Sequence, residues 1–197
     1  MNSLKEQRRI EIIEAAVRVF GEDGYHKGKV EKIAEEAGIG KGTVYEYFSS
    51  KKEIFQQMLK HVFETYIEEA KKTASKENSA RDKFMALLNY HWNFIDLYIN
   101  AIEQIFFQFK NISDEIGPYI IQSHKDMISF LAEIIVEGME TGEIRTDIDK
   151  EGAAFIMLSV IAGSNFMGCS PGDKRHNDAD AEHIVDVLFE GLKASRQ

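Results

Sequence analysis

The 197-residue sequence has few of the residues that interrupt helices or cross-link a chain. Its single cysteine, Cys169, cannot form an internal disulfide or share a zinc site with a second cysteine, which fits a reducing compartment. With only two prolines, Pro118 and Pro171, almost the whole chain can be helical. No run of eighteen apolar residues occurs, and the first residues turn charged without the apolar core of a signal peptide. We therefore expect an all-α, cytoplasmic protein that does not enter a membrane.

Negative charge is in excess, with a formal net charge of −9, but it is unevenly distributed. The first 60 residues hold 11 basic and 10 acidic side chains, and the rest of the chain holds 13 and 23. A polyanion such as DNA would be repelled by the acidic part, which would orient the nearly neutral part toward it. An acidic surface that merely keeps the protein soluble is an equally good interpretation.

Helical periodicity begins at the N-terminus. Ser3 and Glu6 fit a capping box, and Gly24 supplies a left-handed stop about six turns later. Between them, apolar residues recur at helical spacing: Ile10, Ile13, Val17 and Phe20. The pattern predicts a first helix with one apolar face.

Two short helices are predicted next, separated by a glycine turn. Val30, Ile33 and Ala34 form a short amphipathic segment that ends at Gly38, and another runs from Lys41 to about Phe48. Two short helices around a turn of three or four residues are typical of a helix-turn-helix. Ser50 and Glu53 then form a second capping box, which opens a long helix.

The predicted third helix carries polar groups that a purely structural helix would not need. Val44 and Phe48 lie four residues apart and can pack inward. Its other side chains offer hydrogen-bond donors outward, and the glycines near its start let backbone N–H groups approach a phosphate. The residues predicted to contact DNA are Gly40, Lys41, Gly42, Thr43, Tyr45, Tyr47 and, as a phosphate clamp, Lys51. A protein-interaction module with a helix-turn-helix shape is the alternative.

The order and spacing of these motifs resemble the DNA-binding domain of the tetracycline-repressor (TetR) family. The resemblance covers the first third of the chain and rests on Gly24-Tyr25, 30–38, 41–48 and 51–54. It implies a dimeric transcriptional repressor with a divergent ligand-binding body, in which most of the residues just named touch DNA. Where the family commonly has Ser or Thr capping the second helix, this chain has Gly28-Lys29. We therefore expect the phosphate contact there from Lys29.

Five more helices are predicted beyond Ser79, at about 80–98, 100–110, 118–141, 150–168 and 179–195. Gly117-Pro118 is expected to start a helix with proline at its first position, Gly142 to end one, and Asp149 to cap the next. The expected fold has about nine helices: a three-helix helix-turn-helix domain, residues 1–49, joined by a long helix to a ligand-binding and dimerisation domain, residues 50–197.

Aromatic residues are dense in the middle helices and alternate with a few polar ones. Such a pattern is typical of a largely apolar pocket with a few orienting polar groups, and the resemblance places the family's inducer pocket there. The predicted lining is Phe84, Leu88, His91, Trp92, Ile95, Phe106, Phe109, His124, Met127 and Phe130. Core packing is an equally good interpretation of each residue. As a set they favour an apolar, elongated or aromatic effector, such as an acyl chain or acyl-coenzyme A.

The last two predicted helices combine small residues with an apolar stripe, which lets helices approach closely. In the TetR family the last two helices of each subunit form a four-helix dimer interface, and the resemblance implies that role here. The predicted interface residues are Phe155, Leu158, Ser159, Ala162, Ile184, Val187, Leu188 and Gly191. Packing within one subunit is the alternative. The acid-rich start of the last helix is interpreted as a solvated surface, with no metal site.

Three function classes were weighed. The first is a repressor whose homodimer places two recognition helices about 34 to 36 Å apart on a near-palindromic operator and is released by a small apolar effector. The second is an enzyme, which no catalytic motif or cofactor-binding motif in the sequence supports. The third is a DNA-binding adaptor whose body engages a protein partner without a small ligand. The aromatic middle helices favour the first.

Overall fold

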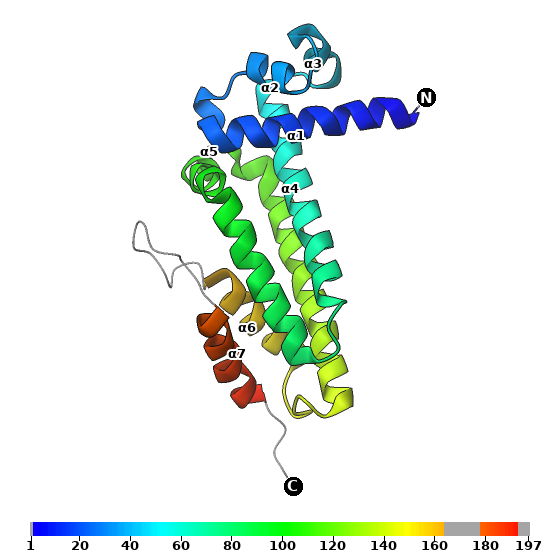
Figure 1. Cartoon of the computed structure of the whole chain (residues 1–197), viewed down its shortest axis with the longest axis vertical. Coiled ribbons are helices and arrows are strands. Elements are labelled where there is room, and N and C mark those ends of the chain that lie inside the picture. The colour runs from blue at the N-terminus through cyan, green and yellow to red at the C-terminus, as the bar shows by residue number, and fades with distance from the viewer. Residues whose placement is uncertain (1, 164–177, 193–197) are drawn as a thin grey trace. The chain divides into compact units, whose positions relative to one another are not determined.

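The computed structural model describes residues 2–163 and 178–192, with side chains described for 4–95, 117–163 and 180–191 (Figure 1). Over these ranges the chain is all-α, as predicted, in seven helical runs. They are α1 Asn2–Lys27, α2 Val30–Glu36, α3 Lys41–Tyr47, α4 Lys51–Ala74, α5 Ala80–Thr141, α6 Lys150–Gly163 and α7 Asp178–Leu192. Contacts divide the chain into two compact units, Met1–Thr65 with Tyr98–Ile120, and Tyr66–Leu97 with Ile121–Gln197.

The first unit is built around a core shared by α1, α2, α3 and the start of α4. Its fully buried members include Ile12, Phe20, Ile33 and Phe48. Phe20 and Phe55 meet edge to face, with ring centroids 5.3 Å apart, a favoured geometry for aromatic pairs. The buried face of α1 is wider than the predicted stripe, because it also includes Ile12, Ala15, Ala16 and Val19. Ile10, which the stripe included, is 38% exposed.

Glycine conformation sets the turns of this unit. Gly24 interrupts the helical geometry of α1 with φ 72°, and Gly38 ends α2 with φ 67°, as the sequence predicts for both. Gly28 has a different reason. A Cβ atom there would lie 2.7 Å from Cδ1 of Phe20 and 2.9 Å from the carbonyl oxygen of Gly24. Close packing of the backbone on Phe20 therefore accounts for a glycine at position 28, one residue before the N-cap of α2.

The long helix α4 begins as predicted. The Ser50 hydroxyl accepts a hydrogen bond from the N–H of Glu53 at 3.1 Å, which caps the helix. The Glu53 carboxylate reaches back to Ser49 and accepts from both its N–H and its hydroxyl, each at 2.7 Å. This is a capping box whose return bond lies one residue earlier than usual.

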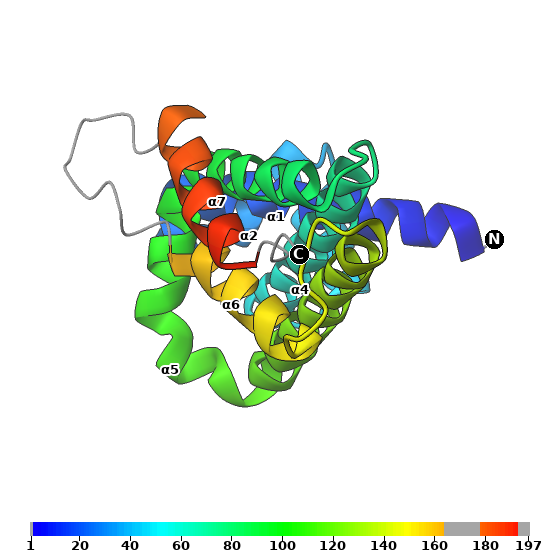
Figure 2. The same ribbon diagram turned by 90° about the horizontal axis from the view of Figure 1, so that it is seen from below.

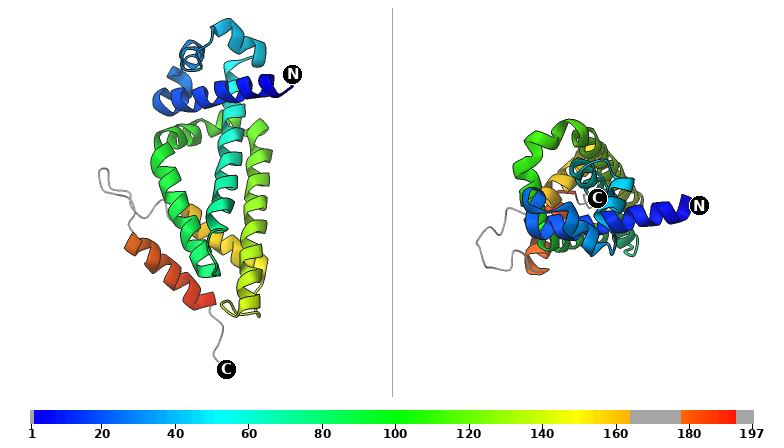
Figure 3. Two further views of the ribbon diagram at one scale, coloured as in Figure 1. Left: turned by 45° about the vertical axis from the view of Figure 1, so that its right-hand side comes forward. Right: turned by 90° about the horizontal axis from the view of Figure 1, so that it is seen from above.

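Helix α5 corrects the prediction of separate helices at 80–98, 100–110 and 118–141. One helical run, α5, spans 62 residues and includes Pro118, which was expected to start a helix. A proline removes only its own N–H, so helical bonding can resume around it with a kink. A straight helix of this length would extend about 93 Å. Lys83 nevertheless pairs with Glu137, so the two ends of α5 lie side by side and the chain turns back between them (Figure 3).

The core of the second unit joins both ends of α5 to the last turns of α4 and to α6 and α7. Its fully buried members include Phe84, Leu88, Leu131 and Ile135. As predicted, Asp149 caps α6 by accepting a hydrogen bond at 2.7 Å, and Gly142 ends α5 with φ 79°. Ser79, which the sequence analysis did not single out as a cap, accepts a hydrogen bond at 2.9 Å from the N–H of Asp82 at the start of α5. Helix α7 packs on the N-terminal part of α5 (Figure 2). The ring centroids of Phe84, on α5, and Phe189, on α7, lie 6.2 Å apart.

The predicted ends of the last two helices, near residues 168 and 195, lie outside the described residues. Among the described helices, none is both long and apolar enough to cross a membrane.

Replacing Gly28 by alanine tests the packing explanation. Because the new Cβ would meet a buried ring and a carbonyl oxygen, we expect Gly28→Ala to lower the free energy of unfolding by about 1 to 3 kcal/mol. Gly21→Ala is the control, since its Cβ would meet nothing within 4 Å and should stabilise α1 by about 0.5 to 1 kcal/mol. Equal midpoints for the two variants in urea unfolding would contradict this role for Gly28.

Candidate functional site

Helix α3 is anchored on one side and open on the other. Val44 and Phe48 are 0% and 1% exposed, so they fix the inward face in the core of the first unit. Tyr45 is 45% exposed, Lys41 is exposed, and Thr43 and Tyr47 are half-buried. A Cβ added at Gly40 or Gly42 would meet nothing within 4 Å, which leaves the backbone at the start of α3 accessible. Lys41 and Tyr45 are thus accessible on α3, whereas Tyr47 packs partly against the core of the first unit.

Lys41 already has an acidic partner within the domain. Its Nζ lies 2.6 Å from Oε1 of Glu31, in the first turn of α2. This hydrogen bond raises the pKa of Lys41 and lowers the pKa of Glu31. The same Nζ lies 5.8 Å from the ring centroid of Tyr45. Lys41 therefore has an acidic counterion within its own domain, a partner that the sequence analysis did not single out.

Lys51, the first residue of α4, contacts the C-terminal end of α1. Its Nζ donates to the backbone carbonyl of His26 at 3.1 Å and lies 4.8 Å from the ring centroid of Tyr25. Partial burial lowers its pKa. A cation is favoured at a helix C-terminus, where carbonyl groups lack internal partners. Lys51 thus joins the start of α4 to the end of α1, a contact across 25 residues that no local pattern reveals.

Lys29 is the N-cap residue of α2. It has the extended backbone of a cap, φ −103° and ψ 141°, but its side chain makes no capping hydrogen bond, and the residue is exposed. Its ammonium is near enough to contribute to the lowered pKa of Glu31. Lys29 and Lys41 therefore both lie near the carboxylate of Glu31.

The predicted pocket residues whose side chains are described separate into three groups by burial. Phe84, Leu88, Trp92 and Met127 are buried together in the core of the second unit, and Ile95 is also buried. His91 and Phe130 are half-buried, the latter 5.5 Å below the Nζ of Lys71. His124 is exposed. The side chains of Phe106 and Phe109 lie outside the described residues.

A tyrosine on α4 supplies a polar partner in this interior that the sequence analysis missed. The Tyr66 hydroxyl lies 2.8 Å from Nδ1 of His91. Its ring packs on Tyr90 and Phe94, with centroids 5.4 and 4.8 Å away, and burial raises the pKa of the hydroxyl. A hydroxyl and an imidazole in an aromatic setting are the kind of polar pair that orients a ligand in an apolar site.

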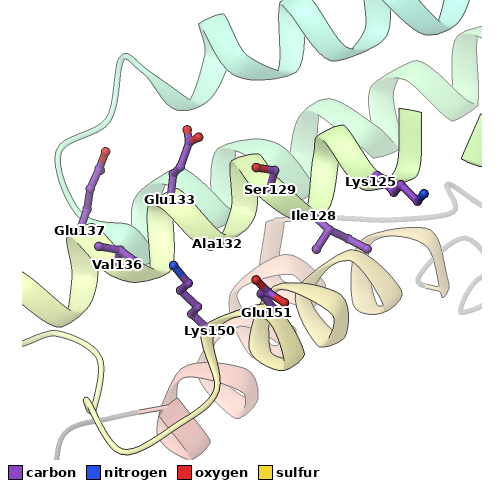
Figure 4. A pocket seen from close by; sticks show the side chains of 9 residues that line it. All are labelled: Lys125, Ile128, Ser129, Ala132, Glu133, Val136, Glu137, Lys150 and Glu151. Atoms are coloured by element: carbon purple, nitrogen blue, oxygen red, sulfur yellow. The ribbon is translucent and has the colours of Figure 1, made fainter. Parts of the chain in front are cut away.

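A surface groove of about 720 Å³ lies between the C-terminal part of α5 and the start of α6 (Figure 4). Its apolar floor includes Ile128 and Val136, and Lys125, Glu133, Lys150 and Glu151 are among its charged walls. None of the ten predicted pocket residues lines it. Its mixed charge favours no single class of ligand.

Five of the eight predicted interface residues of α6 and α7 are exposed, and the other three pack partly against the core of the second unit. Phe155 is 60% and Val187 65% exposed, although both are large and apolar. Ser159, Ala162 and Gly191 are exposed, and Leu158, Ile184 and Leu188 are half-buried. Ile156, 54% exposed, adds to the accessible apolar surface of α6. Large exposed apolar side chains gathered on two helices are typical of an interaction surface.

Comparison with known families identifies the chain. Residues 12–58 match the family described as bacterial regulatory proteins, tetR family, and residues 55–163 match the YsiA-like protein, C-terminal region. The chain belongs to the TetR family. Its predicted membership and its predicted function as a DNA-binding transcriptional regulator are confirmed, and the adaptor alternative is not favoured.

Relatives that match this TetR-family chain over nearly their full length are named as transcriptional regulators, one of them of fatty acid metabolism. It is 30% identical to the fatty acid metabolism regulator protein of Bacillus subtilis (strain 168), over 95% of this chain and 97% of that protein. It is 24% identical to the transcriptional repressor KstR2 of Rhodococcus jostii, over 95% of this chain and 92% of the relative.

Solved structures agree. The regulator FadR from Bacillus subtilis in complex with stearoyl-CoA has a TM-score of 0.70 and 26% identity, covering 93% of this chain and 98% of that one. A TetR-family regulator from Cytophaga hutchinsonii has a TM-score of 0.77 at 16% identity, covering 98% of each chain, and supports the fold.

Lys51 can be tested for its structural contact and for its predicted phosphate contact separately. Lys51→Met keeps the apolar stem but loses the donor to His26, so the free energy of unfolding should fall by about 1 kcal/mol. Lys27→Met, at the exposed last residue of α1, is the control and should change it by less than about 0.5 kcal/mol.

On DNA, a phosphate contact of Lys51 would make the salt slope of Lys51→Met shallower by about 1. Unchanged unfolding would exclude the structural role, and an unchanged slope would exclude the phosphate contact.

Proposed function

We propose that this regulator is a homodimeric repressor that binds a near-palindromic operator through α3 and releases it when a long-chain acyl-coenzyme A enters the second unit. The observation that carries the proposal is the full-length similarity to a FadR solved with stearoyl-CoA, taken with an apolar interior that holds the Tyr66–His91 pair. A regulator of bacterial genes meets its DNA in the cytoplasm, where we place it. We propose no catalytic role and no cofactor.

For the DNA contacts, we propose that Lys41, Thr43, Tyr45 and Tyr47 enter the major groove. Support comes from the accessible side of α3 opposite its buried Val44 and Phe48. We propose that Lys29 and Lys51 approach phosphates, and that the open backbone at Gly40 and Gly42 lets the DNA come close. Residues 1–49 remain our proposed DNA-binding domain, with residues 50–197 as the ligand-binding and dimerisation domain.

For the dimer, we propose that α6 and α7 of two subunits form a four-helix interface. The exposed apolar side chains of Phe155, Ile156 and Val187 support it, because leaving them in water costs free energy that a second copy would recover. A dimer also gives each operator half-site one recognition helix, which roughly doubles the number of DNA contacts.

A charge placed in this surface tests the dimer. We expect Val187→Asp to convert the dimer to monomer in sedimentation at micromolar concentration, because an interface would desolvate the carboxylate. Ile121→Asp adds the same charge to an apolar residue of α5 that is 57% exposed and should leave the dimer intact. A wild-type monomer, or a Val187→Asp dimer of wild-type affinity, contradicts the proposed interface.

For the effector, the decisive measurement is the affinity for an operator duplex selected from random sequence with the purified protein. Saturating stearoyl-CoA should weaken operator binding by roughly 5- to 150-fold, the range of typical allosteric coupling. Stearate and coenzyme A, tested separately, should each have a much smaller effect. An operator affinity unchanged by stearoyl-CoA would exclude it as the effector.

The Tyr66 hydroxyl provides a matched pair of variants for the same assay. Tyr66→Phe keeps the half-buried ring but loses the contact with His91, so it should reduce the response to stearoyl-CoA without changing operator affinity. Tyr119→Phe is the control. It removes a hydroxyl that donates to the carbonyl of Lys60 in the first unit, and its response to stearoyl-CoA should stay as in wild type. Equal responses from both variants would remove Tyr66 from the proposed pocket.

A further inference from the structure

One arginine contacts the C-terminal end of α3 from a helix 38 residues away in sequence. Nη1 of Arg9, on α1, donates to the backbone carbonyl of Tyr47 at 3.2 Å. The guanidinium carbon lies 4.5 Å from the centroid of the Phe48 ring. Tyr47 is the last residue of α3 and Phe48 its C-cap, so both contacts fall where the helix ends.

A helix as short as α3 depends on such contacts. It has seven residues, whereas isolated helices shorter than about 12 to 15 residues are marginal in water. The last carbonyl groups of any helix lack internal partners and carry partial negative charge, so a cation placed there both satisfies and stabilises them. A planar guanidinium offers several donors in one fixed plane, so it can bind the carbonyl while its flat face lies over the ring, whereas a lysine ammonium meets a ring only as a point charge.

The same guanidinium lies near the start of α4. The carboxylate of Glu53, in the first turn of α4, is hydrogen-bonded by Ser49. Those bonds are the main cause of its lowered pKa, and the positive charge of Arg9 adds to it. Arg9 therefore lies at the junction where α3 ends, α4 begins and α1 passes.

We propose that Arg9 is a positioning residue for sequence-specific DNA binding: it fixes the direction of α3 relative to α1 and α4 by binding the Tyr47 carbonyl and stacking on Phe48. The inference rests on the proposed function, in which α3 reads the groove. Its guanidinium acts through these two residues and not by neutralising a phosphate. Loss of Arg9 should therefore reduce discrimination between DNA sequences and leave the general attraction to DNA unchanged.

The neighbouring Arg8 gives a matched control. Its Nη1 pairs with Glu11 on the same helix at 2.6 Å, with half-exposed side chains. Arg9→Met and Arg8→Met remove the same charge from adjacent positions. Each full-length variant would be titrated, over a range of salt concentrations, with the selected operator duplex and with a duplex of unrelated sequence.

Arg9→Met should bind the operator about tenfold more weakly than Arg8→Met, as expected for the loss of a charged hydrogen bond that orders the reading helix. The two variants should bind the unrelated duplex equally and with the same salt slope. Arg9→Lys, which keeps the charge but cannot stack flat on Phe48, should lie between wild type and Arg9→Met. A salt slope lowered by about 1 in Arg9→Met alone would instead assign Arg9 to a phosphate and overturn the proposal.

Hydrogen exchange without DNA separates this inference from the proposed function. In Arg9→Met the amides of α3 should exchange at least several-fold faster, while those of α2 keep wild-type rates. In Arg8→Met both helices should behave as in wild type. Unchanged α3 exchange in Arg9→Met refutes positioning by Arg9. If α3 exchanges faster in Arg9→Met but the wild type prefers no DNA sequence, only the reading role of α3 is refuted.

Discussion

Burial of Val44 and Phe48 is the interaction on which the DNA-binding end of this regulator depends. A seven-residue helix has too few internal hydrogen bonds to persist alone, so α3 exists because these two side chains complete a core that α1, α2 and α4 have already begun. The consequence is a division of labour along one short helix. Its inward residues are fixed by packing, and its outward residues are left free to vary with the DNA sequence.

The contacts around α3 are made by cations that also suit a polyanion. Lys41 is bound to Glu31, Lys51 to the end of α1, and Arg9 to the end of α3. In this nearly neutral domain the three cations thus make contacts that hold its helices together. A more basic domain would have further cations that contact phosphate alone. The nearly neutral domain gains selectivity because it is only weakly attracted to DNA of any sequence.

Local motifs were predictable from the sequence, and long-range ones were not. The caps at Ser50 and Asp149 and the turns at Gly24, Gly38 and Gly142 depend on residues within four positions of one another, and the structure has each where the sequence placed it. Helix α5 was divided wrongly, because Gly117-Pro118 is a strong local signal for a helix start and gives no information on whether helical bonding continues before it. The contacts of Arg9, Lys51 and Tyr66 join residues 25 or more positions apart, which no periodic pattern encodes.

The pairing of Lys41 with Glu31 has a consequence for how the regulator responds to ionic conditions. The ammonium of Lys41 already has the carboxylate of Glu31 as its counterion, so this lysine should contribute less than an unpaired cation to the release of ions from DNA. A change in cellular salt should therefore alter operator affinity less through Lys41 than through a lysine without an acidic partner.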